Sequence, residues 1–267
     1  MKCIVASQLD VAGMNVYRYL ADAFNFKEIG EFHGKPKYIF KDVLLIAINS
    51  SLLEANIDLD VEYYVFASKH KSEAGIKTLT VHAPGNLTSK ALFGGRPRSL
   101  SYANADAMKI ALAELKKMRD KKNMEYLVSF EATHHGPTEL SRPVLFVEVG
   151  STKREWNDQR AIEIVAEACY KAATNKKCFT KALGVGGTHY APLHTKIALK
   201  TEIAIGHIIP SYAIDELSFE VFEQAIRKSN AEFILADWKG MKSKHRKKIK
   251  EYASQLDIEI KKAKDFI

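Results

Sequence analysis

Short apolar runs alternate along the chain with segments whose apolar side chains recur at helical spacing. This alternation of strands and helices predicts an α/β three-layer fold around a mixed, largely parallel sheet. We expect one domain over 1–267, with a softer division near residue 125. The runs typical of strands are 3–6, 38–40, 43–48, 63–67, 78–81, 126–130, 143–149, 179–185, 204–209, 233–236 and 258–260. The segments with helical spacing are 10–24, 105–118, 155–173, 192–199 and 217–228.

Local signals place several boundaries within this pattern. Asp10 suits the N-cap of the first helix, and Pro192 suits the first turn of a later one. Thr152 and Glu155 have the spacing of a capping box, which predicts that they start the helix carrying Ile162. The segment 68–72 is polar and is expected to be a loop between two strands.

Four polar motifs each follow a predicted strand. They are His82-Ala-Pro-Gly-Asn86, Glu131-Ala-Thr-His-His-Gly-Pro137, Glu148-Val-Gly-Ser-Thr152 and Gly184-Val-Gly-Gly-Thr-His-Tyr190. In an open α/β sheet, ligands bind outside the carboxyl ends of the strands, so we expect these motifs to converge there. The paired histidines have no packing role, because a buried imidazole costs free energy unless it has a partner.

The convergence would unite imidazoles with carboxylates, the ligands of a catalytic zinc site. The imidazoles are those of His82, His134, His135 and His189, and the carboxylates are those of Glu131 and Glu148. A metal-free alternative is one histidine acting as general base. The amides of Gly186, Gly187 and Thr188 are candidates for binding an oxyanion or a phosphate, although a tight turn also explains these glycines. Glu148 has an alternative role as a cap of the following helix.

The net charge of +8 is concentrated in one segment, 239–250, which contains seven basic residues and no acid. The remaining 255 residues therefore carry about +1. Such a local patch indicates a polyanionic partner, with contact to RNA phosphates and not to base sequence. The basic residues are Lys239, Lys242, Lys244, Arg246, Lys247, Lys248 and Lys250.

No apolar run approaches the roughly 20 residues of a membrane helix, and no secretory signal is recognisable. Cys3, Cys169 and Cys178 lack metal-binding spacing and are expected to be reduced, buried thiols. Together these features predict a cytoplasmic protein without membrane contact.

In order along the chain, the four motifs resemble those of the archaeal and plant type of D-aminoacyl-tRNA deacylase, a zinc-dependent family. The resemblance rests on His82-x-Pro-Gly-Asn86, Thr133-His-His-Gly-Pro137, Glu148-x-Gly-Ser-Thr152 with Glu155-Trp156, and Gly184-x-Gly-Gly-Thr-His-Tyr-Ala-Pro192. It implies hydrolysis of the ester that joins a D-amino acid to the 3′-terminal ribose of tRNA, which recycles mischarged tRNA. It also implies a zinc cofactor and a fold similar to phosphorylases and peptidyl-tRNA hydrolases.

The leading hypothesis is a monomeric, zinc-assisted hydrolase in which His134, His135 and Glu131 bind the metal or activate water. His82 and His189 would complete the metal site, and Glu148 would orient a ligand or act as general base. The basic segment would hold the acceptor stem of D-aminoacyl-tRNA. The alternatives are a peptidyl-tRNA hydrolase, a nucleoside phosphorylase-like enzyme and a non-catalytic RNA-binding protein.

Overall fold

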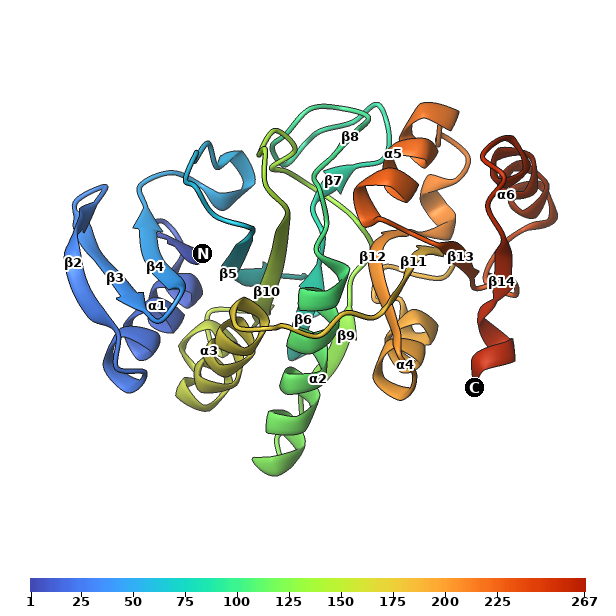
Figure 1. The fold of residues 1–267 in the computed structure, drawn as a ribbon. Coiled ribbons are helices and arrows are strands. Elements are labelled where there is room, and N and C mark those ends of the chain that lie inside the picture. Colours follow the sequence, from blue (N-terminus) through green and yellow to red (C-terminus); the bar gives the residue numbers. More distant parts are fainter.

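The computed structural model describes all 267 residues and contains two main sheets (Figure 1). The larger sheet has eight strands in the order β2-β3-β4-β1-β5-β10-β6-β9. Its strands are β1 (Lys2–Ser7), β2 (Lys27–Phe32), β3 (Lys35–Phe40), β4 (Val43–Ile48), β5 (Tyr64–Lys71), β6 (Thr78–His82), β9 (Leu127–Phe130) and β10 (Val144–Ser151). Two short strands, β7 (Gly85–Asn86) and β8 (Ser99–Leu100), pair with each other separately.

Helices cover only one face of the eight-stranded sheet. They are α1 (Val11–Ala23), α2 (Ala105–Lys121) and α3 (Gln159–Ala173), and they pack on alternate strand residues such as Val65 and Val147. The opposite face is covered by loops and by the short helix η1 (Leu52–Glu54), which pack on Phe66 and Phe146. Strand residues alternate between these faces because successive side chains point in opposite directions.

The second sheet is entirely parallel, in the order β12-β11-β13-β14. Its strands are β11 (Thr180–Val185), β12 (Ile203–Ile209), β13 (Phe233–Ala236) and β14 (Ile260–Lys262). Helices α2 and α4 (Pro192–Lys200) lie on one face, and α5 (Phe219–Ser229) and α6 (Ser243–Gln255) lie on the other (Figure 1). Three short helices, η2 (Glu155–Asn157), η3 (Ser211–Ala213) and η4 (Ala263–Phe266), complete the fold.

The expected α/β class with mixed, largely parallel sheets is confirmed, but the strands form two sheets. Helices flank both faces of the four-stranded sheet, whereas helices on one face and loops with η1 on the other cover the eight-stranded one. The chain passes between the sheets after Ser151, later than the division expected near residue 125. One apolar cluster includes residues of both sheets, which is consistent with a single domain. The domain boundary and the phosphorylase-like likeness stay predictions.

Of the two predicted helix caps, the structure confirms the one at Asp10 and contradicts the one at Thr152. The Asp10 carboxylate accepts a hydrogen bond from the Gly13 amide, which confirms the first cap. Helix α3, however, begins at Gln159 and is capped by Asp158, so the capping-box prediction at Thr152 is wrong. The Glu155 carboxylate instead accepts hydrogen bonds from the amide and hydroxyl of Thr152 within a separate short turn.

Two further expectations concern accessibility. Cys3 and Cys169 are buried free thiols, whereas Cys178 is exposed in the segment between α3 and β11, so the prediction that all three are buried is wrong. None of the helices combines the length and the apolar character that crossing a membrane requires.

Candidate functional site

The loop-covered face of the eight-stranded sheet changes from apolar to polar along its strands. On β5 this face passes from Phe66 to His70, and on β10 it passes from Phe146 to Glu148. Because every second side chain of a strand points to the same face, all four of these side chains lie on one face of the sheet. His82, at the end of β6, lies opposite Phe146 and stacks on its ring at 4.9 Å.

The polar motifs were expected to meet outside a single row of strand carboxyl ends. In the structure they do not. Strand β6 runs antiparallel to β10, so the carboxyl ends of these two strands point to opposite edges. The site therefore forms above the sheet face, where long side chains can meet across β10 and β6. The expected mode of convergence is wrong, although most of its residues are brought together.

The first group of side chains, which we call the His70 cluster, consists of His70, Glu131 and Glu148. The His70 Nδ1 lies 3.0 Å from Glu131 Oε1 and 3.6 Å from Glu148 Oε2. All three are buried, with Glu131 at 1% exposure. Glu148 therefore does not cap a helix, and that alternative is wrong.

Gly150 allows the His70 ring to lie across the neighbouring strand. It pairs with His70 in the β5–β10 register. A Cβ atom on Gly150 would lie 2.7 Å from the His70 Cβ and 2.8 Å from its Cδ2. Since such approaches do not occur between real Cβ atoms, glycine is needed here for close packing and not for an unusual φ angle.

The second group, which we call the three-histidine cluster, consists of His82, His134 and His135. One ligand nitrogen from each lies within 4.8 Å of the others. The Nδ1–H of His134 donates to the Ala132 carbonyl at 2.8 Å, and that of His135 donates to the Gly136 carbonyl at 2.6 Å. These bonds fix the tautomers and leave both Nε2 lone pairs free, the arrangement typical of metal-binding histidines.

His82 supplies an independent argument for a ligand at this cluster. Its side chain is fully buried and neither ring nitrogen makes a hydrogen bond, although the Nε2 lies 3.7 Å from Glu148 Oε2. A buried polar atom without a partner costs about 1–3 kcal/mol, so a folded protein rarely retains one without another use. The three imidazoles are nitrogen donors that suit Zn²⁺, and they leave a fourth position for water or substrate. The residues therefore fit a metal ion.

The second sheet contributes a wall to the site. The Ala132 amide donates to the His189 carbonyl at 2.7 Å, which joins the end of β9 to the loop after β11. The His189 Nε2 lies 3.0 Å from Glu131 Oε2, and its Nδ1 lies 3.4 Å from the Tyr212 hydroxyl. The His189 side chain is 34% exposed, so this wall is open to solvent.

Tyr190 extends the same wall toward the His70 cluster. Its hydroxyl lies 3.1 Å from the His70 Nε2. His70 thus has a partner at each ring nitrogen, because its Nδ1 faces Glu131. The loop after β11 therefore contacts the His70 cluster through two consecutive side chains, Glu131 through His189 and His70 through Tyr190.

The two clusters differ in their protonation. Burial and the neighbouring His135 and His82 hold the pKa of His134 well below its usual range, and burial lowers the pKa of His135 to about 4. Burial also opposes a charge on His70, but Glu131 and Glu148 outweigh it and raise the pKa of His70 to about 11. The three-histidine cluster therefore holds neutral imidazoles at His134 and His135, whereas His70 is an imidazolium.

The two carboxylates are ionised despite their burial. Burial raises the pKa of Glu131, but His189 and His70 more than compensate and leave it well below its usual range. In the same way, His70 and His82 lower the pKa of Glu148 to about 2 against the effect of burial. A buried negative charge is tolerated when it is paired in this way.

The glycine turn after β11 lies beside the site without offering all the expected donors. Gly186 and Gly187 both have positive φ angles. The Gly186 amide donates to the Ile209 carbonyl at 2.8 Å, so it is not free to bind an oxyanion in this conformation. Thr188 lines a groove on the outer side of the loop.

The basic segment is divided between free and engaged side chains. Lys244 pairs with Asp215 at 2.6 Å, and Lys248 donates to the carbonyls of Ile214 and Asp215. The Arg246 guanidinium lies over the Trp238 ring. The exposed lysines of the segment are Lys239, Lys242, Lys244, Lys247 and Lys250.

His70 is the important residue that the sequence analysis missed. The polarity of residues 68–72 predicts a loop, whereas β5 continues to Lys71. The alternation of Phe66, Ser68 and His70 with Val65 and Ala67 was the available signal, since it continues the period of a strand into the polar residues.

Buried imidazoles beside paired, ionised carboxylates define a class of site that activates water or a carbonyl group, as in hydrolases. The family model for D-aminoacyl-tRNA deacylase matches residues 57–261. The chain therefore belongs to the D-aminoacyl-tRNA deacylase family, whose members are carboxylic ester hydrolases. This confirms the resemblance carried by the four motifs.

Individual relatives match over nearly their whole length. The D-aminoacyl-tRNA deacylase of Pyrococcus furiosus is 38% identical and is matched over 97% of this chain and 99% of its own length. That of Archaeoglobus fulgidus is also 38% identical, over 99% of this chain and 97% of its own. The crystal structure of a conserved protein of unknown function superposes with a TM-score of 0.92 at 37% identity, covering 100% of this chain and 96% of the other.

Proposed function

We propose that the chain hydrolyses the ester bond of D-aminoacyl-tRNA, releasing the D-amino acid and tRNA, with a zinc ion held by His82, His134 and His135. The observation that carries this proposal is the three-histidine cluster, in which buried His82 makes no hydrogen bond and has its Nε2 3.7 Å from Glu148 Oε2. His134 and His135 are already neutral and oriented, as metal coordination requires. Zinc bound there would polarise the ester carbonyl and lower the pKa of bound water to about 7.

The carboxylate of Glu131 orients the histidine that moves the proton. It lies against the Nε2–H of His189 and leaves the Nδ1 of that ring as the acceptor on the solvent side. His189 takes a proton from the attacking water at Nδ1, in the manner of a base oriented by a carboxylate. When the bond from the carbonyl carbon to the ribose oxygen breaks, the same proton passes to that oxygen.

His70 and Glu148 support this arrangement without touching the ester. The His70 imidazolium keeps Glu131 ionised, and Glu148 contributes a second negative charge 3.6 Å from the same ring. The buried pair therefore fixes the position of Glu131. We assign His189 the role of the base in place of the expected role of zinc ligand, although Glu131, His134 and His189 also lie close enough together to hold a metal ion. That assignment follows from its contact with Glu131.

The free lysines of the basic segment would contact the phosphates of the acceptor stem. This segment is linked through Ser211 to the loop after β11, which carries His189. The Ser211 amide donates to the Gly187 carbonyl of that loop, and the Ser211 hydroxyl donates to the Gly240 carbonyl of the basic segment. Lys239 directly precedes Gly240, Lys242 follows it by two positions, and both lysines are exposed. Cytoplasmic location and a monomeric state stay predictions.

A direct test offers purified protein D-Tyr-tRNA and L-Tyr-tRNA, with and without a chelator, after metal analysis of the protein. We expect selective cleavage of the D-ester, one zinc equivalent bound to the cluster and loss of activity with chelator. Equal cleavage of both esters, or none when zinc is present, would contradict the proposal. Cleavage that resists the chelator in metal-free protein would favour the metal-free general-base alternative.

A further inference from the structure

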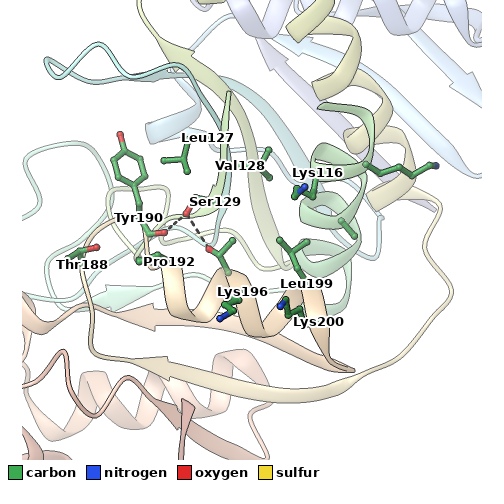
Figure 2. Close-up of a pocket in the computed structure, with 13 residues that line it drawn as sticks. Lys116, Leu127, Val128, Ser129, Thr188, Tyr190, Pro192, Lys196, Leu199 and Lys200 are labelled. Carbon is green, nitrogen blue, oxygen red and sulfur yellow. Dashed lines mark hydrogen bonds between the residues drawn. The ribbon is translucent and has the colours of Figure 1, made fainter. Parts of the chain in front are cut away.

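A groove with a cavity volume of about 830 Å³ lies outside the two clusters, between α2 and α4 (Figure 2). Its floor is the edge strand β9, with the apolar side chains of Leu127 and Val128, and Leu199 faces them from α4. Leu127 is 43% exposed, so the floor offers an apolar surface to a ligand. The volume lies within the range of about 300–1,000 Å³ that is typical of ligand sites.

Lysines line the rim of the groove on both helices, and none of its lining residues is acidic. Lys116 and Lys117 on α2 have intrahelical partners, Asp120 and Glu114. Lys196 and Lys200 on α4 are exposed and have no ion-pair partner. Residues four positions apart lie on the same side of a helix, so these two free ammonium groups can both contact an anionic ligand in the groove.

The walls of the groove are held in place before any ligand binds. The Lys109 Nζ, buried on α2, donates to the Ala198 carbonyl and, at 2.6 Å, to the Thr201 carbonyl at the end of α4. The Ser129 hydroxyl of β9 contacts the Thr195 hydroxyl of α4 at 3.2 Å. The groove is therefore preorganised, which lowers the cost of binding.

One end of the groove reaches the catalytic site. Tyr190 lines the groove, and its hydroxyl lies 3.1 Å from the His70 Nε2. Thr188 lies at the same end, and His189, between these two residues in the chain, contacts Glu131 (Figure 2). A chain bound along the groove can therefore present its terminus to the carboxylate-bound His189.

We propose that this groove binds the single-stranded 3′ end of tRNA, an inference that rests on the proposed function. Phosphates pair with Lys196 and Lys200, and bases lie on Leu127 and Leu199. Cationic side chains beside an apolar surface match the alternation of charged phosphates and flat bases in a single strand. The acceptor stem remains outside, toward the basic segment.

The test measures binding of two unacylated RNA hairpins, one with a single-stranded 3′-ACCA overhang and one blunt. The wild-type protein is expected to prefer the overhang. Replacing both groove lysines, Lys196→Ala with Lys200→Ala, should weaken binding of the overhang hairpin about tenfold and reduce its salt slope by about 1.4, the value for two lost single-strand phosphate contacts. Binding of the blunt hairpin should not change.

A matched control removes the same charge elsewhere. Lys27→Ala with Lys41→Ala alters two exposed lysines at the opposite edge of the eight-stranded sheet and should leave the overhang preference intact. A floor variant, Leu127→Asp, should weaken overhang binding without altering the blunt hairpin. If the groove and control variants bind the overhang equally well, the inference is wrong and the groove serves another anionic partner, such as an acidic protein segment.

Ester hydrolysis is measured in parallel, so that the two proposals can fail separately. If the wild-type protein cleaves D-aminoacyl-tRNA but the groove variants bind the overhang normally, only the groove assignment is overturned. If the wild-type protein cleaves no ester but the groove lysines still determine overhang binding, the proposed reaction is overturned and the RNA-binding groove remains.

Discussion

The three-histidine cluster and the His70 cluster lie side by side on one sheet face, yet burial affects them in opposite ways. In the three-histidine cluster, burial lowers the pKa of His134 and His135 and keeps them neutral. In the His70 cluster, two carboxylates overcome the same effect and keep His70 charged. Burial disfavours charge in general, so the difference lies in which partners the fold brings within about 4 Å.

This contrast gives the two clusters different chemical uses. Neutral imidazoles with free lone pairs suit a metal ion, whereas a charged histidine between carboxylates suits fixed positioning. Glu131 connects the two, because its Oε2 lies 3.5 Å from the His134 Nε2 and its Oε1 lies 3.0 Å from the His70 Nδ1. Variants that affect one cluster and spare the other can separate these uses.

The largest effect is expected for His135→Ala. Loss of one of three zinc ligands should lower the deacylation rate about 10³-fold, because the ion stabilises transition-state charge by several kcal/mol. Zinc content, measured on the purified variant, should fall with the rate, whereas tRNA affinity should stay the same. His33→Ala, at the opposite edge of the sheet, is the control; retention of full zinc and activity by His135→Ala would exclude this residue as a ligand.

Glu131→Gln should have the next largest effect. It removes the negative charge beside both His189 and His70, so turnover should fall about 10²-fold or more, while zinc remains bound. The free energy of unfolding should fall by about 3 kcal/mol, because the His70 charge loses a partner. Both quantities can be measured on one preparation, by deacylation kinetics and by denaturant unfolding.

Glu148→Gln is the matched comparison, since it leaves the contact between Glu131 and His189 in place. Its turnover should fall less than that of Glu131→Gln, at a similar loss of stability. Zinc content is measured on both variants, because Glu148 also lies 3.7 Å from the proposed ligand His82. If the two variants lose activity equally with zinc still bound, His189 is not the proton acceptor that Glu131 orients.

Gly150→Ala should have a smaller effect that is specific to the His70 cluster. The added methyl group would collide with the His70 ring, and the strain should destabilise the fold by about 1–3 kcal/mol. In a double-mutant cycle with His70→Ala, only part of the cost of the Gly150 substitution should disappear, because the ring atom Cδ2 is removed while the Cβ and carbonyl oxygen of residue 70 remain within 2.8 Å. Additive effects in this cycle would show that the collision with the His70 ring does not contribute to the loss of stability in Gly150→Ala.

The smallest effect concerns His207, a buried histidine with a purely structural environment. Its Nε2–H donates to the Ser101 carbonyl at 2.8 Å, and its Nδ1 accepts from the Thr133 hydroxyl at 3.0 Å. Burial lowers its pKa to about 4, so its contribution to stability is complete above the ordinary value of about 6.5 and is lost as the pH falls toward 4.

His207→Gln should therefore make the unfolding free energy less dependent on pH. Between pH 6.5 and 5 the wild-type protein should lose up to about 2 kcal/mol more than the variant. Denaturant unfolding at several pH values measures the difference. An unchanged slope would mean that His207 is protonated in the folded protein.

Much of the site could be predicted from the sequence, because short motifs carry its turns and its polar side chains. The Thr133–Pro137 segment places two histidines on a turn whose carbonyls fix their Nδ1 atoms, and those bonds are local. His70 could not be placed in the same way. Its importance depends on Glu131 and Glu148, which are 61 and 78 positions away in the sequence.

The groove could not be predicted either. Its walls come from α2, β9 and α4, and the spacing of Lys196 and Lys200 resembles that of any solvated helix. The basic segment, by contrast, is conspicuous in the sequence, yet Lys244, Arg246 and Lys248 are partly engaged by contacts within the fold. Local charge density shows how many cations are present but not which remain free.

The sequence by itself determined the alternation of strands and helices, the turns that hold the histidines and the family to which the chain belongs. These features depend on neighbouring residues, through side-chain period, backbone preference and short hydrogen bonds. The tertiary structure decided the antiparallel pairing of β6 with β10, the division into two sheets and the charge of each buried histidine. Those properties depend on strand pairing and on burial next to partners that are distant in the sequence. The free energies of pairing and of charging a buried histidine are therefore set only when the whole chain is folded.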